Sequence, residues 1–103
     1  MTELLAVEEI NQRISQISDW KLEGNKLKYI KTVKNFVEAI NFVNKLVAPA
    51  EASQHHPDLE VSYNKVKVIL TTHDAGGLTE KDFSMAQTIS NLFESNFNNP
   101  KGS

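Results

Sequence analysis

The spacing of apolar residues changes near residue 19, and the change predicts a helix followed by a β-hairpin. Between residues 7 and 17 the apolar side chains recur at steps of three and four, at Val7, Ile10, Ile14 and Ile17. That is the period of one helix face, so a helix is expected from about Val7 to Ile17. The segment Trp20–Glu23 alternates, Leu27–Val33 is rich in β-forming residues, and Gly24-Asn25 between them is a turn signal, which together indicate a hairpin.

The same two patterns return in the middle of the chain. From Asn35 to Ala50 the spacing is helical, and Pro49 is expected to kink or end the helix. One face of this helix would carry Phe36, Ala39, Ile40, Val43, Leu46 and Val47. The segments Leu59–Tyr63 and Val66–Leu70 then alternate on either side of Asn64-Lys65, a pair that suits a tight turn, so a second hairpin is expected.

A third long helix is expected near the end of the chain. The segment from Asp74 to Gly77 interrupts the strand pattern, and a helix-start signal follows, with Thr79 as N-cap and Asp82 as the third helical residue. The helix is expected to run to about Asn96, with inward positions at Met85, Ile89, Leu92 and Phe93. Spacing alone makes Asp82 a capping residue, because a carboxylate in the first turn faces the positive end of the helix dipole.

The resulting order, α-β-β-α-β-β-α, predicts an α+β fold with a four-stranded antiparallel sheet and helices packed on one face. The other face would be solvated or would contact another subunit, and an open sheet edge is an economical route to a dimer. With 103 residues the chain has the length of one domain. We expect that domain to span residues 1–97 and residues 98–103 to form a flexible tail.

Composition narrows the class of protein. The net charge is −2 and the basic residues are dispersed, which argues against a nucleic-acid partner. There is no apolar run of about 18 residues, so no membrane span is expected. Residues 1–5 also lack the basic and apolar regions of a signal peptide. Because the chain has no cysteine, disulfides and thiol nucleophiles are excluded, and we expect a soluble cytoplasmic protein.

The three histidines are the residues best suited to chemistry. His55 and His56 are adjacent and precede Pro57, and His73 follows the last predicted strand. Histidine has an ordinary pKa of about 6.5, so a cluster of histidines can supply both a proton donor and a proton acceptor near neutral pH. If the second hairpin folds back, His73 meets the corner formed by His55 and His56 at one end of the sheet.

Simpler interpretations of these residues stay open at this point. A single histidine is most often a solvated surface side chain. Trp20 and Tyr63 are most often core aromatics, although Tyr63 ends a predicted strand and could lean over a pocket.

A metal site built from His73, Asp74 and the histidine corner is a further alternative, and the spacing disfavours it. Pro57 pushes His56 towards extended geometry, and neighbouring side chains of an extended segment point to opposite sides. His55 and His56 are therefore poorly placed to bind one metal ion together.

Three motifs of the chain closely resemble the pterin-4a-carbinolamine dehydratase family. They are Glu51-x-x-x-His55-His56-Pro57, Val61-x-Tyr63-Asn64-Lys65-Val66 and Thr72-His73-x-x-Gly76-Gly77-Leu78-Thr79-x-x-Asp82. Trp20 after the first helix and the segment Phe36-x-x-Ala39-x-x-Phe42 are also similar to that family. The resemblance covers roughly residues 7–95, and the fold that it implies agrees with the order of elements above.

The resemblance implies an enzyme that removes water from 4a-hydroxytetrahydropterin to give quinonoid dihydropterin, in the recycling of the cofactor of aromatic amino acid hydroxylases. A pterin substrate is implied, with no metal and no cofactor. The implied catalytic residues are His55, His56, His73 and Asp82, and the implied substrate contacts come from Glu51, Pro57 and Tyr63. Two of the histidines, His55 and His73, would exchange protons with the substrate.

The resemblance also implies a homodimer or homotetramer. Some animal members of the family act as dimerisation cofactors of a homeodomain transcription factor. A non-catalytic binding module of the same fold is therefore the alternative to an enzyme, with the surface of the second helix as the place to look for a partner.

Overall fold

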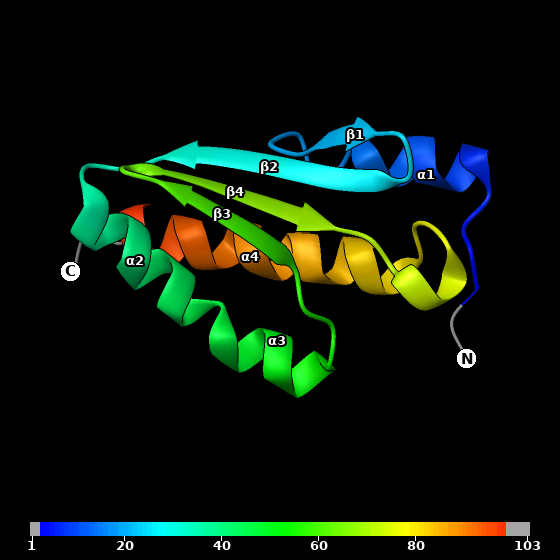
Figure 1. Ribbon diagram of the computed structural model, residues 1–103. Helices are drawn as coiled ribbons and strands as arrows, with labels where there is room; N and C mark the ends of the chain where they lie inside the picture. Colours follow the sequence, from blue (N-terminus) through cyan, green and yellow to red (C-terminus); the bar gives the residue numbers. More distant parts are fainter. Residues whose placement is uncertain (1–2, 99–103) are drawn as a thin grey trace.

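The computed structural model describes residues 3–98, and Figure 1 shows a sheet with its helices packed against one face. Along the chain the elements are α1 (Val7–Ile14), β1 (Lys21–Glu23), β2 (Lys26–Thr32), α2 (Phe36–Lys45), α3 (Val47–Ser53), β3 (Asp58–Ser62), β4 (Lys65–Leu70), the short 3-10 helix η1 (His73–Ala75) and α4 (Glu80–Asn98). The predicted α+β class and the four antiparallel strands are confirmed.

The strands lie in the order β1-β2-β4-β3, so the two hairpins join through their longer strands, β2 and β4. Alternate residues of these two strands point into the core, and they are Leu27, Tyr29, Val66, Val68 and Leu70. The opposite face is charged: Lys28 contacts Glu23 at 2.7 Å, and Lys67 contacts Glu60 at 3.2 Å. The hydrogen bond from Lys28 holds the pKa of Glu23 below its ordinary value. Ile30, which is exposed, lies on the same face, so this face carries both charged and apolar side chains.

Trp20 joins the first hairpin to α4. The Trp20 ring stacks on Tyr29, with 5.1 Å between the ring centroids, and its Nε1 donates to Ser90 Oγ at 2.9 Å. The side chain is buried and its only polar atom has a partner, which is the ordinary arrangement for a buried indole. Trp20 is a core residue, as the sequence predicted.

The predicted helix from Asn35 to Ala50 is two helices, α2 and α3, which meet at Leu46. Pro49 was expected to mark the break, and that position is wrong by three residues. Pro49 lies in the first turn of α3, where a missing N–H costs nothing because it has no intrahelical acceptor. The helix is interrupted before Pro49, at Leu46, whose N–H bonds to Val43 O at 3.0 Å.

The second hairpin turns one residue earlier than predicted. Ser62 pairs with Lys65, so the turn is Tyr63-Asn64 and not Asn64-Lys65. Asn64 explains the difference, because its Nδ2 donates to Val33 O at 3.1 Å and its carbonyl accepts from the Val33 N–H at 2.8 Å. These bonds hold the turn against the end of β2, at the opposite end of β3 from Asp58.

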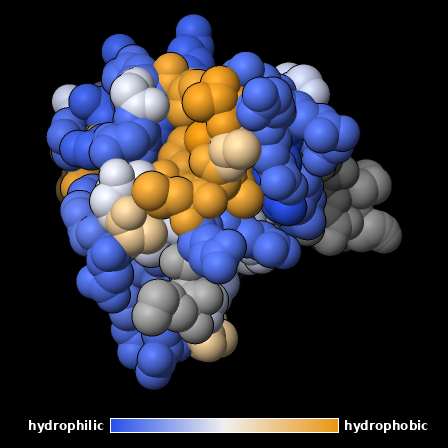
Figure 2. Space-filling view, turned by 90° about the vertical axis from the view of Figure 1, so that its right-hand side faces the viewer, coloured by the Kyte–Doolittle hydropathy of each residue, from blue (hydrophilic) through white to orange (hydrophobic). Residues whose placement is uncertain are grey.

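The first helix is shorter than the predicted Val7–Ile17, since α1 ends at Ile14, and Ile17 is buried beyond it. Val7 is exposed and does not face the core. Leu4, another exposed residue, precedes it, and Figure 2 shows an apolar patch on the end of the molecule where this segment lies. The segment is held by the Leu5 N–H, which donates to Leu78 O at 3.0 Å.

The last helix, α4, runs on to Asn98. The predicted flexible tail, 98–103, otherwise falls outside the described residues. Within residues 3–98, none of the helices is long and apolar enough to cross a bilayer.

Candidate active site

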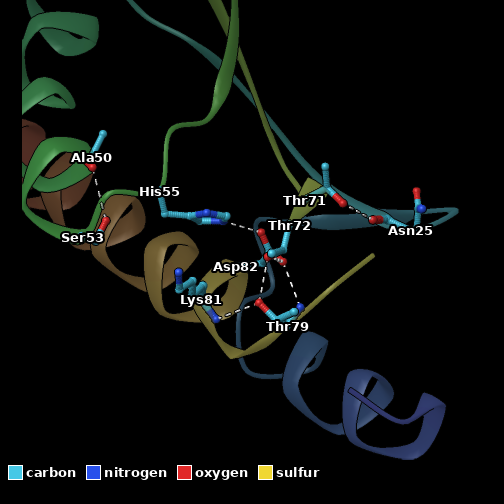
Figure 3. Close-up of polar contacts among 9 residues, drawn as sticks. All are labelled: Asn25, Ala50, Ser53, His55, Thr71, Thr72, Thr79, Lys81 and Asp82. Carbon is cyan, nitrogen blue, oxygen red and sulfur yellow. Dashed lines mark hydrogen bonds and ion pairs between the residues drawn. The ribbon is translucent and has the colours of Figure 1, made fainter. Parts of the chain in front are cut away.

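The carboxylate of Asp82 is the centre of a buried polar network (Figure 3). Its Oδ1 lies 2.6 Å from His55 Nε2. Its Oδ2 accepts hydrogen bonds from Thr72 Oγ1 at 2.7 Å and from the Thr79 N–H at 2.9 Å. The Asp82 side chain is 0% exposed, and both of its oxygens have partners, which is what makes the burial of a carboxylate tolerable.

Local sequence explains how Asp82 is held. Thr79 precedes α4, and its Oγ1 accepts from the Lys81 N–H at 3.2 Å while the Asp82 carboxylate accepts from the Thr79 N–H. The bond from the Thr79 N–H to Asp82 is one half of a capping box, while the Thr79 hydroxyl bonds to the residue before Asp82. Thr79 is thus the N-cap, and Asp82 is a capping residue. Asp82 is more than a cap, because its second oxygen faces His55.

His55 reaches Asp82 because α3 ends in an abrupt turn. Gln54 adopts a left-handed conformation with φ 54° and ψ 40°. The Gln54 N–H bonds to Glu51 O and the His55 N–H to Ala50 O, the pair of bonds that closes a helix in a Schellman motif. The turn directs His55 inward, and only 10% of its side chain is exposed.

The neighbouring histidine, His56, points outward to a carboxylate of its own. His56 Nε2 lies 2.7 Å from Glu51 Oε2, and these side chains are 58% and 70% exposed. Because His55 and His56 face different carboxylates, the corner does not present two imidazoles to one ion. In residues 3–98 no group of three or more histidine, aspartate and glutamate side chains is arranged to hold a metal.

His73 is the first residue inside a closed loop. Thr72 and Gly77 form a two-way backbone bridge, with N–H to O distances of 3.0 and 3.3 Å. Gly76 closes the loop with φ 80°, and a side chain on Gly77 would meet Leu4 at 3.0 Å. The bridge therefore places His73, which is exposed, immediately after the threonine that bonds to Asp82.

The structure separates the remaining predicted site residues. Pro57 is half-buried and joins the histidine corner to β3, so it lies beside the network in the chain. Tyr63 is 65% exposed in the turn at the other end of β3. Within one subunit the fold does not bring Tyr63 to the histidines.

Thr72 was not singled out from the sequence, although a signal for it exists. Val66, Val68 and Leu70 are the inward residues of β4, and the same alternation continues to Thr72. A hydroxyl at the next inward position needs a buried partner. Its partners are Asp82 and Thr79, whose Oγ1 lies 2.8 Å from Thr72 Oγ1.

A cavity of about 360 Å³ lies between α3 and α4 beside His55. Its wall includes Pro49 and Ser53 from α3, and its other side includes Glu80, Lys81 and Ser84 from α4. The volume is within the range of sites for small molecules. The wall offers hydroxyl groups, one positive charge and one negative charge next to a buried histidine. Such groups suit acid–base chemistry on a small polar substrate.

Comparison with known proteins shows which family the chain resembles. Residues 3–92 match the family model described as pterin 4 alpha carbinolamine dehydratase. A Trichodesmium erythraeum protein named for pterin-4-alpha-carbinolamine dehydratase is 92% identical over 92 residues, which are 89% of this chain and 99% of that protein. A protein of the same name from Trichormus variabilis is 61% identical over the same shares of the two chains.

A solved structure agrees with these relatives. The crystal structure of a transcriptional coactivator/pterin dehydratase from Brucella melitensis superposes with a TM-score of 0.81 at 30% sequence identity. The match covers 85% of this chain and 96% of that chain. The resemblance noted from the histidine motifs is confirmed: the chain belongs to the pterin 4 alpha carbinolamine dehydratase family, a family of hydro-lyases.

Proposed function

We propose that this protein removes water from a 4a-hydroxytetrahydropterin and releases the quinonoid dihydropterin, as part of tetrahydropterin recycling for aromatic amino acid hydroxylases. The C4a–O bond breaks after a proton is delivered to the hydroxyl oxygen, which leaves as water. The N5 lone pair forms the new bond to C4a, and the N5 proton leaves. The reaction therefore needs one proton donor and one proton acceptor. Membership of the family and the names of the relatives support this substrate.

The buried contact between His55 and Asp82 is the observation that carries the proposal. Taking a histidine and a carboxylate out of water is costly unless they are paired and hydrogen-bonded. Here both are almost fully buried, next to a cavity of the right size for a small molecule. A carboxylate that accepts a hydrogen bond from one ring nitrogen orients the imidazole for proton transfer at the other nitrogen.

The roles that we propose combine the family resemblance with the contacts of the side chains. His55 and His73 exchange protons with the substrate, and Asp82 orients His55. His56, held by Glu51, binds and orients the pterin from the exposed side. Pro57 keeps the two adjacent histidines on different sides of the chain. Tyr63 is left out of the proposal, because it lies at the far end of β3.

We also propose that the chain forms a homodimer or homotetramer in the cytoplasm. Large apolar residues stay exposed along α2 and α3, including Phe36, Val37 and Val47. Strand β3 is a sheet edge whose residues are all exposed. Exposed apolar residues and an open strand edge are features that association covers. A chain without cysteine has no need of an oxidising compartment.

Turnover of synthetic 4a-hydroxytetrahydropterin by the purified protein tests the proposal. His55→Ala and His73→Ala should each lower kcat by about 10²-fold or more, because a positioned acid or base contributes about 10²- to 10⁴-fold. Asp74→Ala is the matched control, since Asp74 is an exposed neighbour of His73. Circular dichroism should show that each variant is folded. Unchanged turnover in both histidine variants would refute the assignment.

The alternatives give different results in the same assay. A non-catalytic binding module would self-associate without accelerating loss of the carbinolamine. The observation that favours a binding module is that the Brucella melitensis structure is described as a transcriptional coactivator as well as a pterin dehydratase. Loss of activity after treatment with a chelator would contradict a mechanism that uses only the side chains named above.

A further inference from the structure

We propose that the hydroxyl groups of Thr72 and Thr79 form a one-way hydrogen-bond chain that ends on Asp82 and fixes the tautomer of His55. The chain places the proton of neutral His55 on Nε2 and leaves Nδ1 as the nitrogen that exchanges a proton with the substrate. This inference rests on the proposed function, because it names positioning residues for the same site. Neither threonine is assigned contact with the substrate; both act through Asp82.

The direction of the chain follows from which atoms can only donate and which can only accept. The Lys81 backbone N–H, 3.2 Å from Thr79 Oγ1, can only donate. The Asp82 carboxylate, 2.7 Å from Thr72 Oγ1, can only accept. The single hydroxyl proton of Thr72 therefore goes to Asp82. In the 2.8 Å contact between the two hydroxyls, Thr79 must then be the donor and Thr72 the acceptor.

The chain leaves Asp82 one oxygen for His55. Oδ2 already accepts from the Thr72 hydroxyl and from the Thr79 N–H. Oδ1 faces His55 Nε2 at 2.6 Å, and with a carboxylate in that position the ring nitrogen must donate. No hydrogen bond of the other ring nitrogen, Nδ1, is found in the described part of the chain, and His55 is a lining residue of the cavity beside α4. Nδ1 is therefore the atom available to a ligand.

Packing alone does not account for two facing threonines. Thr72 continues the inward row of β4, where the three preceding positions are filled by valine and leucine. Valine has nearly the shape of threonine and would fill the space without a buried polar atom. A buried hydroxyl is costly unless it is paired, and within residues 3–98 these two hydroxyls pair with each other, a backbone N–H and Asp82. The hydrogen bonds, and not the shape of the side chains, therefore distinguish threonine from valine at these two positions.

The proposed effect on the reaction is control of which nitrogen reacts. If Asp82 lost a donor, its carboxylate could rotate or share its acceptor sites with water, and His55 could populate the tautomer with the proton on Nδ1. That form cannot accept a proton through Nδ1. The substrate would still bind, so the loss should fall on kcat and leave KM nearly unchanged.

Paired substitutions separate the hydroxyl from the shape of the side chain. Thr72→Val and Thr79→Val remove one hydroxyl each, whereas Thr72→Ser and Thr79→Ser keep it. Thr71→Val is the matched control, because the Thr71 hydroxyl donates to Asn25 O at 2.8 Å and does not touch Asp82 (Figure 3). We expect kcat to fall by about 10- to 100-fold in Thr72→Val, as for outer-shell partners of oriented histidines. Thr72→Ser should recover most of it, and Thr71→Val should keep wild-type turnover.

Long-range ¹H–¹⁵N spectra of the histidine rings give a readout that does not depend on activity. The His55 signals are identified by their loss in His55→Ala. In the wild-type protein, at a pH where His55 is neutral, the proton should be on Nε2. In Thr72→Val the spectrum should show a mixture of tautomers, and in Thr72→Ser it should return to the wild-type form.

The outcomes distinguish this inference from the proposed function. A wild-type His55 protonated on Nδ1, or a Thr72→Val variant with unchanged tautomer and kcat, overturns the one-way chain. An inactive wild-type protein whose His55 tautomer still depends on Thr72 supports the chain and overturns the dehydratase proposal. If Thr72→Val does not fold, the wild-type tautomer and the comparison of Thr79→Val with Thr79→Ser decide the question.

Discussion

Two adjacent histidines make nearly the same contact in very different surroundings. His55 lies 2.6 Å from Asp82, and His56 lies 2.7 Å from Glu51. The side chains of the first pair are 10% and 0% exposed, and those of the second are 58% and 70% exposed. Asp82 also accepts two further hydrogen bonds, whereas no other hydrogen bond of the Glu51 side chain is found in the described residues.

The difference shows that distance alone does not rank these contacts. An exposed ion pair is weakened by water and salt and by the freedom of its side chains, so it typically contributes about 0–1 kcal/mol. A buried pair is expensive to form, and breaking it leaves an uncompensated buried group. The inner pair should therefore govern chemistry and stability, while the outer pair should tune binding.

The largest difference between the inner and outer pairs is expected in the turnover of variants that lack the carboxylate. Asp82→Asn keeps the size of the side chain but replaces one acceptor oxygen by a donor, which favours the wrong tautomer of His55. We expect kcat to fall by about 10²- to 10⁴-fold, the range for loss of an oriented acid–base group. Glu51→Gln, the same change in the outer pair, should cost less than about 10-fold. Equal losses in a steady-state assay would remove the distinction between the pairs.

The second largest difference between the inner and outer pairs is expected in the free energy of unfolding. Asp82→Ala removes the capping carboxylate and leaves the buried polar groups of His55 and Thr72 without this hydrogen-bond partner. We therefore expect a loss of about 3–5 kcal/mol in the free energy of unfolding. Glu51→Ala should cost under about 1 kcal/mol. Urea denaturation followed by circular dichroism measures both. A similar loss in the two variants would mean that burial of the inner pair contributes little.

A substitution in the turn that directs His55 inward should have a smaller effect on stability, of opposite sign. Gln54 is left-handed, a conformation that strains a residue with a side chain and suits glycine. Gln54→Gly should raise the free energy of unfolding by about 0.5–1 kcal/mol and keep His55 on Asp82. Ala52→Gly, an exposed helical position two residues earlier, should lower it by about 1 kcal/mol. Destabilisation by Gln54→Gly would show that the Gln54 side chain has a role of its own.

The smallest effect is expected in the outer pair itself. A double-mutant cycle with Glu51→Gln and His56→Gln, measured where histidine is charged, should give a coupling energy of about 0.5 kcal/mol. At 1 M salt the coupling should approach zero, because exposed charges are screened. Coupling that survives high salt would show that the outer pair is shielded from solvent, and the comparison with the inner pair would need revision.

Much of the fold could be predicted from local patterns. The spacing of Thr79 and Asp82 identified a helix start, and in the structure both side chains cap the first turn of α4. The positions of the strands followed from alternation, because side chains of a strand point to opposite faces in turn. Boundaries were less accurate. The turn at Tyr63-Asn64 depends on a hydrogen bond to Val33, 31 positions away, which no local pattern contains. The helix is interrupted at Leu46, three residues before Pro49.

The residues of the candidate site could be predicted, but not which of them contact one another or which are buried. The motif resemblance named His55, His56 and Asp82 together, and adjacent side chains were expected to diverge. Nothing in the chain's local pattern indicated which histidine would be buried. Thr72 was missed because a threonine after a strand is unremarkable until its hydroxyl is seen to face a carboxylate.

Local sequence was sufficient for the helices, the strands and the cap that holds Asp82, since these depend on residues a few positions apart. The inward turn of His55 onto Asp82 joins residues 27 positions apart, and the bond from Thr72 joins residues 10 positions apart. These contacts exist because α3 and β4 both meet the first turn of α4 when the core forms. Burial then makes the contact between His55 and Asp82 more important than the similar contact between His56 and Glu51. Water is removed from a contact only when the whole molecule packs, so no single segment of the sequence determines it.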